Sequence, residues 1–168
     1  IEHKMGIHAS PTCVMSFGEK EGAIGYLLGP PNAGLSFMFI MMNAARLSVG
    51  AQGLAQSARA CQLAREWART RLQGRVEGKP APVPIIEHPD VRRMLLGMKS
   101  RTEAMRVLCA YAAMELDKGT RLADEAARKS ALARAELMIP IVKGWCTETG
   151  FEVTSLGVQV HGGMGYVE

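Results

Sequence analysis

The feature that most constrains the fold is a long apolar stripe that begins soon after Gly34. Small and apolar residues recur there in alternating steps of four and three. They are Ile40, Ala44, Leu47, Ala51, Leu54, Ala58 and Cys61. Such steps place side chains on one face of an α-helix, which predicts a helix from Gly34 to about Leu72. At 1.5 Å per residue this helix is about 55 Å long, so it needs neighbouring helices to cover its face.

A second helix is predicted after residues 74–88, a linker in which three prolines at positions 80, 82 and 84 break regular structure. Pro89 suits the first helical position, and Asp90 places negative charge near the positive end of the helix dipole. An apolar stripe then runs to Lys118 and Gly119, a pair typical of a helix end.

A third helix is predicted from near Thr120, with Thr120 and Asp124 as its amino-terminal signals. Pro140 should kink this helix or divide it in two. Long striped helices joined by short connections predict a mainly α fold, an up-and-down bundle.

Residues 1–31 have a different pattern. Three short stretches of β type, residues 4–8, 12–17 and 23–28, are separated by Ser-Pro and Gly-Glu-Lys-Glu-Gly turn sequences. Two or three short strands are marginal without a partner sheet. We therefore expect residues 1–31 to be the end of a β-domain and residues 32–168 to form a helical domain.

The composition favours helices and excludes several functions. Eleven methionines and only 5% aromatic residues favour closely packed helices, and a net charge of +4 scattered among acids gives little support for nucleic-acid binding. No apolar run suggests a membrane span, so no membrane partner is expected. Cysteines at 13, 61, 109 and 146 lack metal-site spacing and predict buried, reduced thiols in a cytoplasmic protein.

A glycine-rich segment near the end is the strongest functional signal. Gln159 is followed by Gly162, Gly163 and Gly165, with His161 between. Glycine lets the backbone turn tightly and offers bare N–H groups to an anion, although a glycine-rich turn after a helix is more often only a turn. The role of His161 is open, and a lone histidine at such a place is more often a structural side chain than a catalyst.

This segment occurs together with two others. One is residues 4–12, followed by Leu27-Leu28-Gly29 and Asn32-Ala33-Gly34, and the other is residues 45–56. In this order and spacing the chain resembles the acyl-CoA dehydrogenases over nearly its whole length, as a carboxyl-terminal portion. The resemblance implies FAD as cofactor, an acyl-CoA substrate, an electron-transfer flavoprotein as partner, and a homodimer or homotetramer. His8 and residues 88–96 resemble the branch that includes 3-methylmercaptopropionyl-CoA dehydrogenases.

The resemblance assigns substrate-binding residues to the first helix. Arg46 matches an arginine beside the flavin and the thioester, whereas spacing alone favours a solvated arginine. Asn43 stands where several members have an aspartate facing the pantetheine arm, and Met42 lies in the stretch that lines the acyl pocket, although methionine here is more often a core residue.

Cofactor-binding residues come from two further segments. Arg71 matches an arginine that contacts FAD of the neighbouring subunit, while the helix dipole and solvation would also explain an arginine there. Gln73 and Gly74 replace a hydroxylated residue and an aromatic, so the aromatic contact should be missing. Gln159, Gly162 and Gly163 match residues that reach the adenosine-diphosphate half of FAD.

The implied reaction is α,β-dehydrogenation of a short acyl-CoA, in which a carboxylate takes the α-proton and the β-hydrogen leaves as hydride to the flavin. Family members place that glutamate either directly before the helix arginine, where this chain has Ala45, or beyond the glycine-rich loop. Glu168 follows the loop too closely, so no catalytic base is assigned here; it is expected beyond Glu168, and the isolated fragment should be inactive. The alternatives are a non-catalytic helical assembly module and a related flavin oxidase or hydroxylase.

Overall fold

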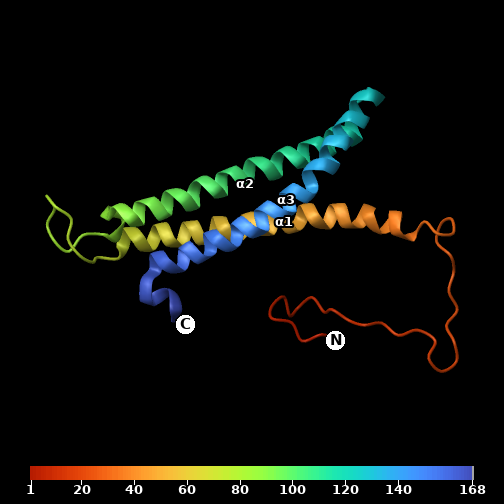
Figure 1. Cartoon of the computed structure of the whole chain (residues 1–168), viewed down its shortest axis with the longest axis horizontal. Helices are drawn as coiled ribbons and strands as arrows, with labels where there is room; N and C mark the ends of the chain where they lie inside the picture. The colour runs from red at the N-terminus through yellow and green to blue at the C-terminus, as the bar shows by residue number, and fades with distance from the viewer. Residues whose placement is uncertain (168) are drawn as a thin grey trace. The chain divides into compact units, whose positions relative to one another are not determined.

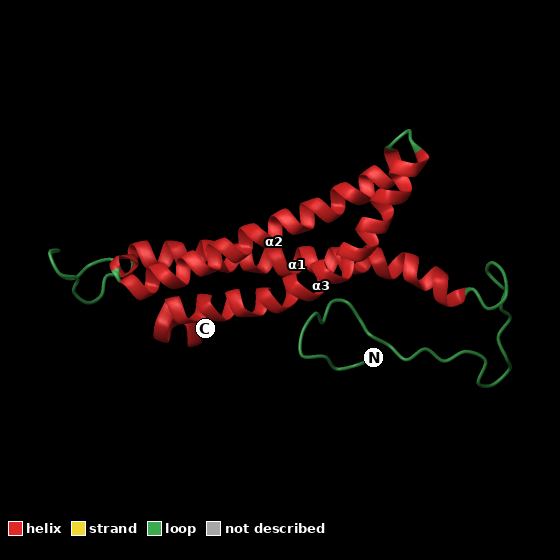
Figure 2. Cartoon of the chain, turned by 45° about the horizontal axis from the view of Figure 1, so that its top comes forward, coloured by secondary structure: helices red, strands yellow, loops and turns green. Residues whose placement is uncertain are grey.

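The computed structural model describes residues 1–167, and its secondary structure is almost entirely helical (Figures 1 and 2). Glu168, which the sequence argument rejects as a base, lies outside the described residues. The elements are α1 (Gly34–Thr70), η1 (Ile85–Glu87), α2 (Pro89–Arg121), α3 (Glu125–His161) and η2 (Gly162–Tyr166). The chain divides into two compact units, Ile1–Phe37 and Met38–Glu168.

The first unit has no strand in the described residues, unlike the three β-type stretches predicted there. Its chain is extended, and its apolar side chains are exposed, for example Tyr26 and Met5. A strand needs a partner for its ladder hydrogen bonds, and here only Glu2 N donates to Thr12 O across the unit, at 2.8 Å. Cys13 is exposed as well, so the expectation of a buried thiol is wrong at this position.

The second unit confirms the predicted helical bundle, in which α1, α2 and α3 run alternately up and down (Figure 1). Pro89 occupies the start of α2 with Asp90 in the first turn, as predicted. The predicted end at Gly119 is early, because α2 continues to Arg121. A Cβ at Gly119 would lie 2.5 Å from Leu132 Cδ2, so this glycine permits close helix packing instead of ending the helix.

Helix α3 begins later than Thr120, which is still part of α2. Its N-cap is Asp124, whose carboxylate accepts a hydrogen bond from the amide of Ala127 at 2.7 Å. Pro140 lies inside α3 and does not divide it, although the ribbon changes direction part-way along (Figure 2).

Close contact between α1 and α3 depends on glycine. A Cβ at Gly50 would lie 2.5 Å from a Val142 methyl group, and one at Gly53 would lie 2.5 Å from the carbonyl oxygen of Cys146. Backbones can approach this closely only where side chains are missing. The buried core beside these contacts comes from all three helices and includes Ala64, Ala68, Met98, Met105, Cys109, Val142, Cys146 and Val153.

Helix α1 corrects one further expectation. By length and composition it is the one helix in residues 1–167 that could cross a membrane, whereas the sequence suggested no such span. A mostly buried core helix of a soluble protein passes the same test, whereas only 6% of this apolar window is buried. The close contacts of α1 with α3 lie further along the helix, at Gly50 and Gly53. Its amino-terminal part remains exposed, including Ile40 and Met41.

Candidate functional site

The chain leaving α1 is held in an extended pair. Leu72 forms an antiparallel bridge with Pro84, Gln73 N donates to Val83 O at 2.9 Å, and Ile85 N donates to Arg71 O at 2.9 Å. Side chains two apart in an extended chain share a side. Arg71 and Gln73 therefore line the same hollow beside the end of α1.

The end of α3 is built by glycines with two different tasks. Gly162 has φ +63°, a conformation that other residues adopt with strain, and it caps the helix through its N–H to Gln159 O. Gly165 lets η2 pack back on α3, because a Cβ there would lie 2.5 Å from Val158 O. Gly163 has neither constraint, since a Cβ would meet nothing within 4 Å.

These two segments enclose one hollow of about 630 Å³, within the range of small-ligand sites. All five residues predicted to bind the cofactor line it: Arg71, Gln73, Gln159, Gly162 and Gly163. They come from positions that are almost 90 residues apart in the sequence, and the structure brings them together where α1 and α3 both end (Figure 1).

An aromatic stack forms the centre of the hollow. The ring of His161 lies on Trp67 with centroids 5.4 Å apart and an interplanar angle of 23°, and the Arg71 guanidinium lies 5.8 Å from the Trp67 centroid. The Trp67 indole N–H is buried and has no acceptor among the described residues.

The polar lining suits an anion. Arg71, two histidines and two glutamines line the hollow, and none of its lining residues is an acid. A diphosphate is best held by an arginine together with backbone N–H groups at a glycine-rich turn. The residues therefore fit the diphosphate end of a dinucleotide.

The predicted substrate-binding residues lie elsewhere. Met42, Asn43 and Arg46 are half-buried on α1. Arg46 precedes Thr70 by 24 residues, about 36 Å along the helix, and its guanidinium lies 5.8 Å from the ring centre of Phe39. None of these three residues lines the hollow at Arg71.

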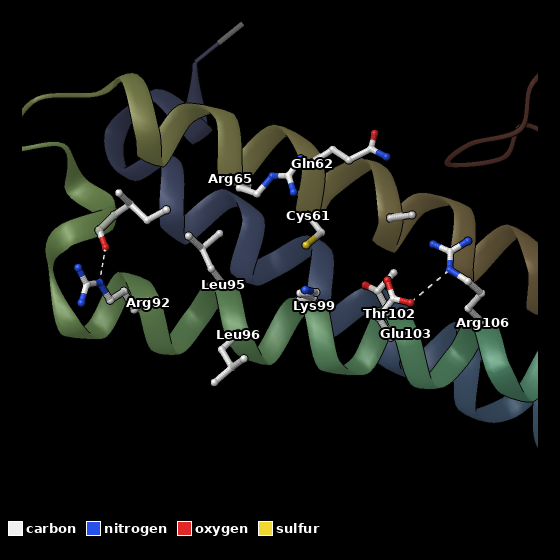
Figure 3. A pocket seen from close by; sticks show the side chains of 12 residues that line it. Cys61, Gln62, Arg65, Arg92, Leu95, Leu96, Lys99, Thr102, Glu103 and Arg106 are labelled. Atoms are coloured by element: carbon white, nitrogen blue, oxygen red, sulfur yellow. Dashed lines mark hydrogen bonds and ion pairs between the residues drawn. The ribbon is translucent and has the colours of Figure 1, made fainter.

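A second hollow of about 410 Å³ lies between α1 and α2 and contains none of the predicted residues (Figure 3). Arg65 and Gln62 line it from α1, and Lys99 and Arg106 from α2. Burial raises the pKa of the Cys61 thiol in its wall, and the nearby Arg65 and Lys99 partly oppose that rise.

Sequence reasoning missed several lining residues of the larger hollow. Trp67 and His88 occur in segments that the sequence analysis compared with the family, but nothing in their spacing assigns them to the site. His88 directly precedes the Pro89 helix start, a position that indicates only a boundary. His88 reaches the hollow because the linker folds back, whereas Trp67 lies near the end of α1.

Comparisons with known proteins identify the family of the chain. The sequence profile described as "Acyl-CoA dehydrogenase, C-terminal domain" matches residues 32–168. The whole chain aligns with 28% of the length of 3-methylmercaptopropionyl-CoA dehydrogenase from Ruegeria pomeroyi, and the aligned residues are 51% identical. It also aligns with 29% of the length of a butyryl-CoA dehydrogenase from Syntrophomonas wolfei, at 35% identity. A third relative is the broad-specificity linear acyl-CoA dehydrogenase FadE5 from Mycobacterium tuberculosis, of which the chain covers 29% at 34% identity.

In each of these three relatives the chain covers less than a third of the protein, so it corresponds to part of such an enzyme. The profile match takes in all three helices and the glycine-rich end of α3. The chain belongs to the acyl-CoA dehydrogenase family and represents its C-terminal helical domain.

Proposed function

We propose that the protein containing this chain is an FAD-dependent acyl-CoA dehydrogenase, and that this chain supplies the surface for the adenosine-diphosphate half of FAD. The observation that carries the proposal is the convergence of five predicted residues on one acid-free hollow. Bound FAD would supply the electron acceptor for removing two hydrogens from the acyl chain.

The residues of the hollow divide this binding task. The Arg71 guanidinium, fixed near Trp67, provides charge-assisted hydrogen bonds to a diphosphate. The backbone at Gly162 and Gly163 is free of side chains and can approach the ligand closely. Gln159 already donates through its amide to the Tyr166 hydroxyl at 2.7 Å, which holds its side chain over η2.

The proposed substrate is a short acyl-CoA thioester. The relative from Ruegeria pomeroyi, by its name, acts on 3-methylmercaptopropionyl-CoA, and the relative from Syntrophomonas wolfei on butyryl-CoA. Arg46, Asn43 and Met42 are proposed to contact the substrate, and an electron-transfer flavoprotein is the proposed acceptor. We assign no catalytic base to this chain, and no acid lines the hollow at Arg71.

Self-association is part of the proposal. Four consecutive apolar residues of α1, Met38, Phe39, Ile40 and Met41, are each between 41% and 74% exposed. Contiguous apolar surface of this kind marks a contact with other protein surface. A homodimer or homotetramer of the full-length protein in sedimentation is expected, and a monomer at micromolar concentration would contradict it.

The test uses the full-length protein and two variants matched in chemistry. Arg71→Ala should weaken FAD binding by about 10- to 150-fold, which corresponds to the 1.5 to 3 kcal/mol of a charged hydrogen bond. Arg75→Ala removes an exposed arginine that does not line the hollow and should leave FAD binding unchanged. Flavin per subunit after gel filtration and a flavin titration give both values.

Gly163→Val separates ligand contact from folding. A Cβ at this position meets no protein atom within 4 Å, so we expect the fold to tolerate the substitution while the ligand cannot approach. Loss of flavin with an unchanged melting temperature is expected. If the full-length protein binds no flavin and reduces no dye with either acyl-CoA, the assembly-module alternative replaces this proposal. Oxygen consumption in the same assay would indicate the oxidase or hydroxylase alternative.

A further inference from the structure

We propose that His88 and His161 contact the ligand of this hollow, each accepting a hydrogen bond from the nucleoside part of the bound dinucleotide. The inference rests on the proposed function, since it concerns the same site. It adds two binding residues that the sequence analysis left open or did not assign. The contacts that hold each imidazole ring support these two roles.

One nitrogen of each ring is committed to a backbone carbonyl. His88 Nε2 lies 2.9 Å from Gln73 O, and His161 Nδ1 lies 2.7 Å from Gly157 O. A carbonyl oxygen only accepts, so each of these nitrogens carries the proton and donates. The tautomer of each neutral ring is thereby fixed, and the other nitrogen is an acceptor.

The remaining nitrogens are free for a ligand. His88 Nδ1 and His161 Nε2 have no hydrogen-bond partner within residues 1–167, and both side chains line the hollow beside Arg71. Adenosine carries the complementary donors, namely two ribose hydroxyls and an amino group. The diphosphate offers only acceptors at neutral pH, so it is matched by Arg71 and the glycine N–H groups instead.

The position of each ring is also fixed by packing. A Cβ at Gly74 would lie 3.1 Å from His88 Cε1 and 3.2 Å from its Nε2, so the imidazole uses the space that glycine leaves. Gly74 also has φ +77°, which favours glycine for a second reason. His161 is held by its stack on Trp67. Two rings that are held in place lose little entropy when they bind a ligand.

The experiment uses variants of the full-length protein that keep one hydrogen bond and remove the other. His88→Gln places an amide nitrogen near the position of Nε2, and His161→Asn places one near Nδ1. Each therefore preserves the donor to the carbonyl and removes the free acceptor. His88→Ala and His161→Ala remove both, and His3→Ala, an exposed histidine outside the hollow, is the control.

ADP and inorganic pyrophosphate are titrated separately into the flavin-free protein by calorimetry, and flavin content is measured alongside. His88→Gln and His161→Asn should each lower ADP affinity about three- to tenfold, as much as the alanine variants. Pyrophosphate affinity should not change, because Arg71 is intact. Melting temperatures show which variants remain folded.

Four outcomes would overturn the inference. ADP affinity at the wild-type level in His88→Gln and His161→Asn would make the histidines structural. An equal loss of pyrophosphate affinity would move the contact to the phosphates. If Arg71→Ala loses flavin while all the histidine variants retain it, the inference fails and the proposed function stands. A wild-type protein that binds neither FAD nor ADP would remove both.

Discussion

The two halves of the helical unit are held together differently. In the half that contains the hollow, three helices lie side by side, and small residues such as Gly53, Ala64 and Ala68 allow close contact. In the other half α2 and α3 extend as a pair, away from α1 (Figure 1). There the buried Glu115 carboxylate forms two ion pairs, one with Lys118 Nζ at 3.0 Å and one with Arg134 Nε at 2.7 Å.

The difference explains where the larger hollow forms. A hollow with fixed walls needs several elements that end near one another, and this happens where α1 and α3 stop beside the folded linker. Met42, Asn43 and Arg46 lie on α1 and do not line that hollow. We therefore expect a substrate site at these residues to use other surfaces of the full-length protein.

The largest effect is expected from Gly53→Ala in the three-helix half. The added Cβ would lie 2.5 Å from the Cys146 carbonyl oxygen, and a backbone atom cannot move aside without separating the helices. We expect a loss of about 2 to 3 kcal/mol in the free energy of unfolding of the full-length protein, measured in urea.

Gly97→Ala is the control for this change, because a Cβ at Gly97 meets nothing within 4 Å. Alanine has the higher helix propensity, so this variant should gain up to about 1 kcal/mol. Equal stability of the Gly53 and Gly97 variants would mean that α1 and α3 are not held in close contact.

The next effect separates the proposed cofactor end of α1 from its proposed substrate end. Arg46→Ala in the full-length protein should lower kcat/KM for an acyl-CoA about tenfold or more while flavin content stays unchanged. Arg71→Ala should lower flavin content first. Steady-state kinetics with added FAD, together with flavin content, distinguish the two. Loss of flavin in both variants would contradict separate sites.

Much of the fold could be predicted from the sequence, since apolar steps of four and three specify helices locally. The first helix was predicted to end at about Leu72 and ends at Thr70. The misses occurred where tertiary contacts decide the outcome. Gly119 resembled a stop signal but provides room for Leu132. Residues 1–33 have strand-like composition but no strand, because pairing depends on a partner segment.

The candidate site was predictable only in part. Arg71 and Gln159 were found through short motifs that resemble a known family, and the structure places them in one hollow. His88 was not assigned, because its place in the site depends on the linker folding back through the Leu72–Pro84 bridge. Such a long-range contact has no periodic signature in the sequence.

A smaller effect is expected from Asp124→Ala in the two-helix half. Loss of the carboxylate that accepts from Ala127 N should cost about 1 kcal/mol in unfolding free energy. Asp117→Ala, which removes an exposed and distant partner of Arg121, should cost less than about 0.5 kcal/mol. Flavin content should stay unchanged in both variants. A loss of flavin would show that the two halves are coupled.

The smallest effect, and one that depends on pH, is expected from Glu115→Gln. Hydrogen bonds from Lys118 and then Arg134 lower the pKa of Glu115 despite its burial, which acts in the opposite direction. A lowered pKa in the folded state stabilises the fold above the ordinary glutamate pKa, and that stabilisation is lost as the pH falls through the folded value. The effect is modest because the cations are 41% and 46% exposed, so water also solvates them.

Wild type should therefore be more stable than Glu115→Gln at neutral pH, and the difference should shrink as the pH falls below about 4.3. Glu136→Gln, at an exposed glutamate without an ion-pair partner in residues 1–167, should follow wild type in the same urea series. A difference between wild type and Glu115→Gln that does not change with pH would mean that the carboxylate acts through packing and not through its charge.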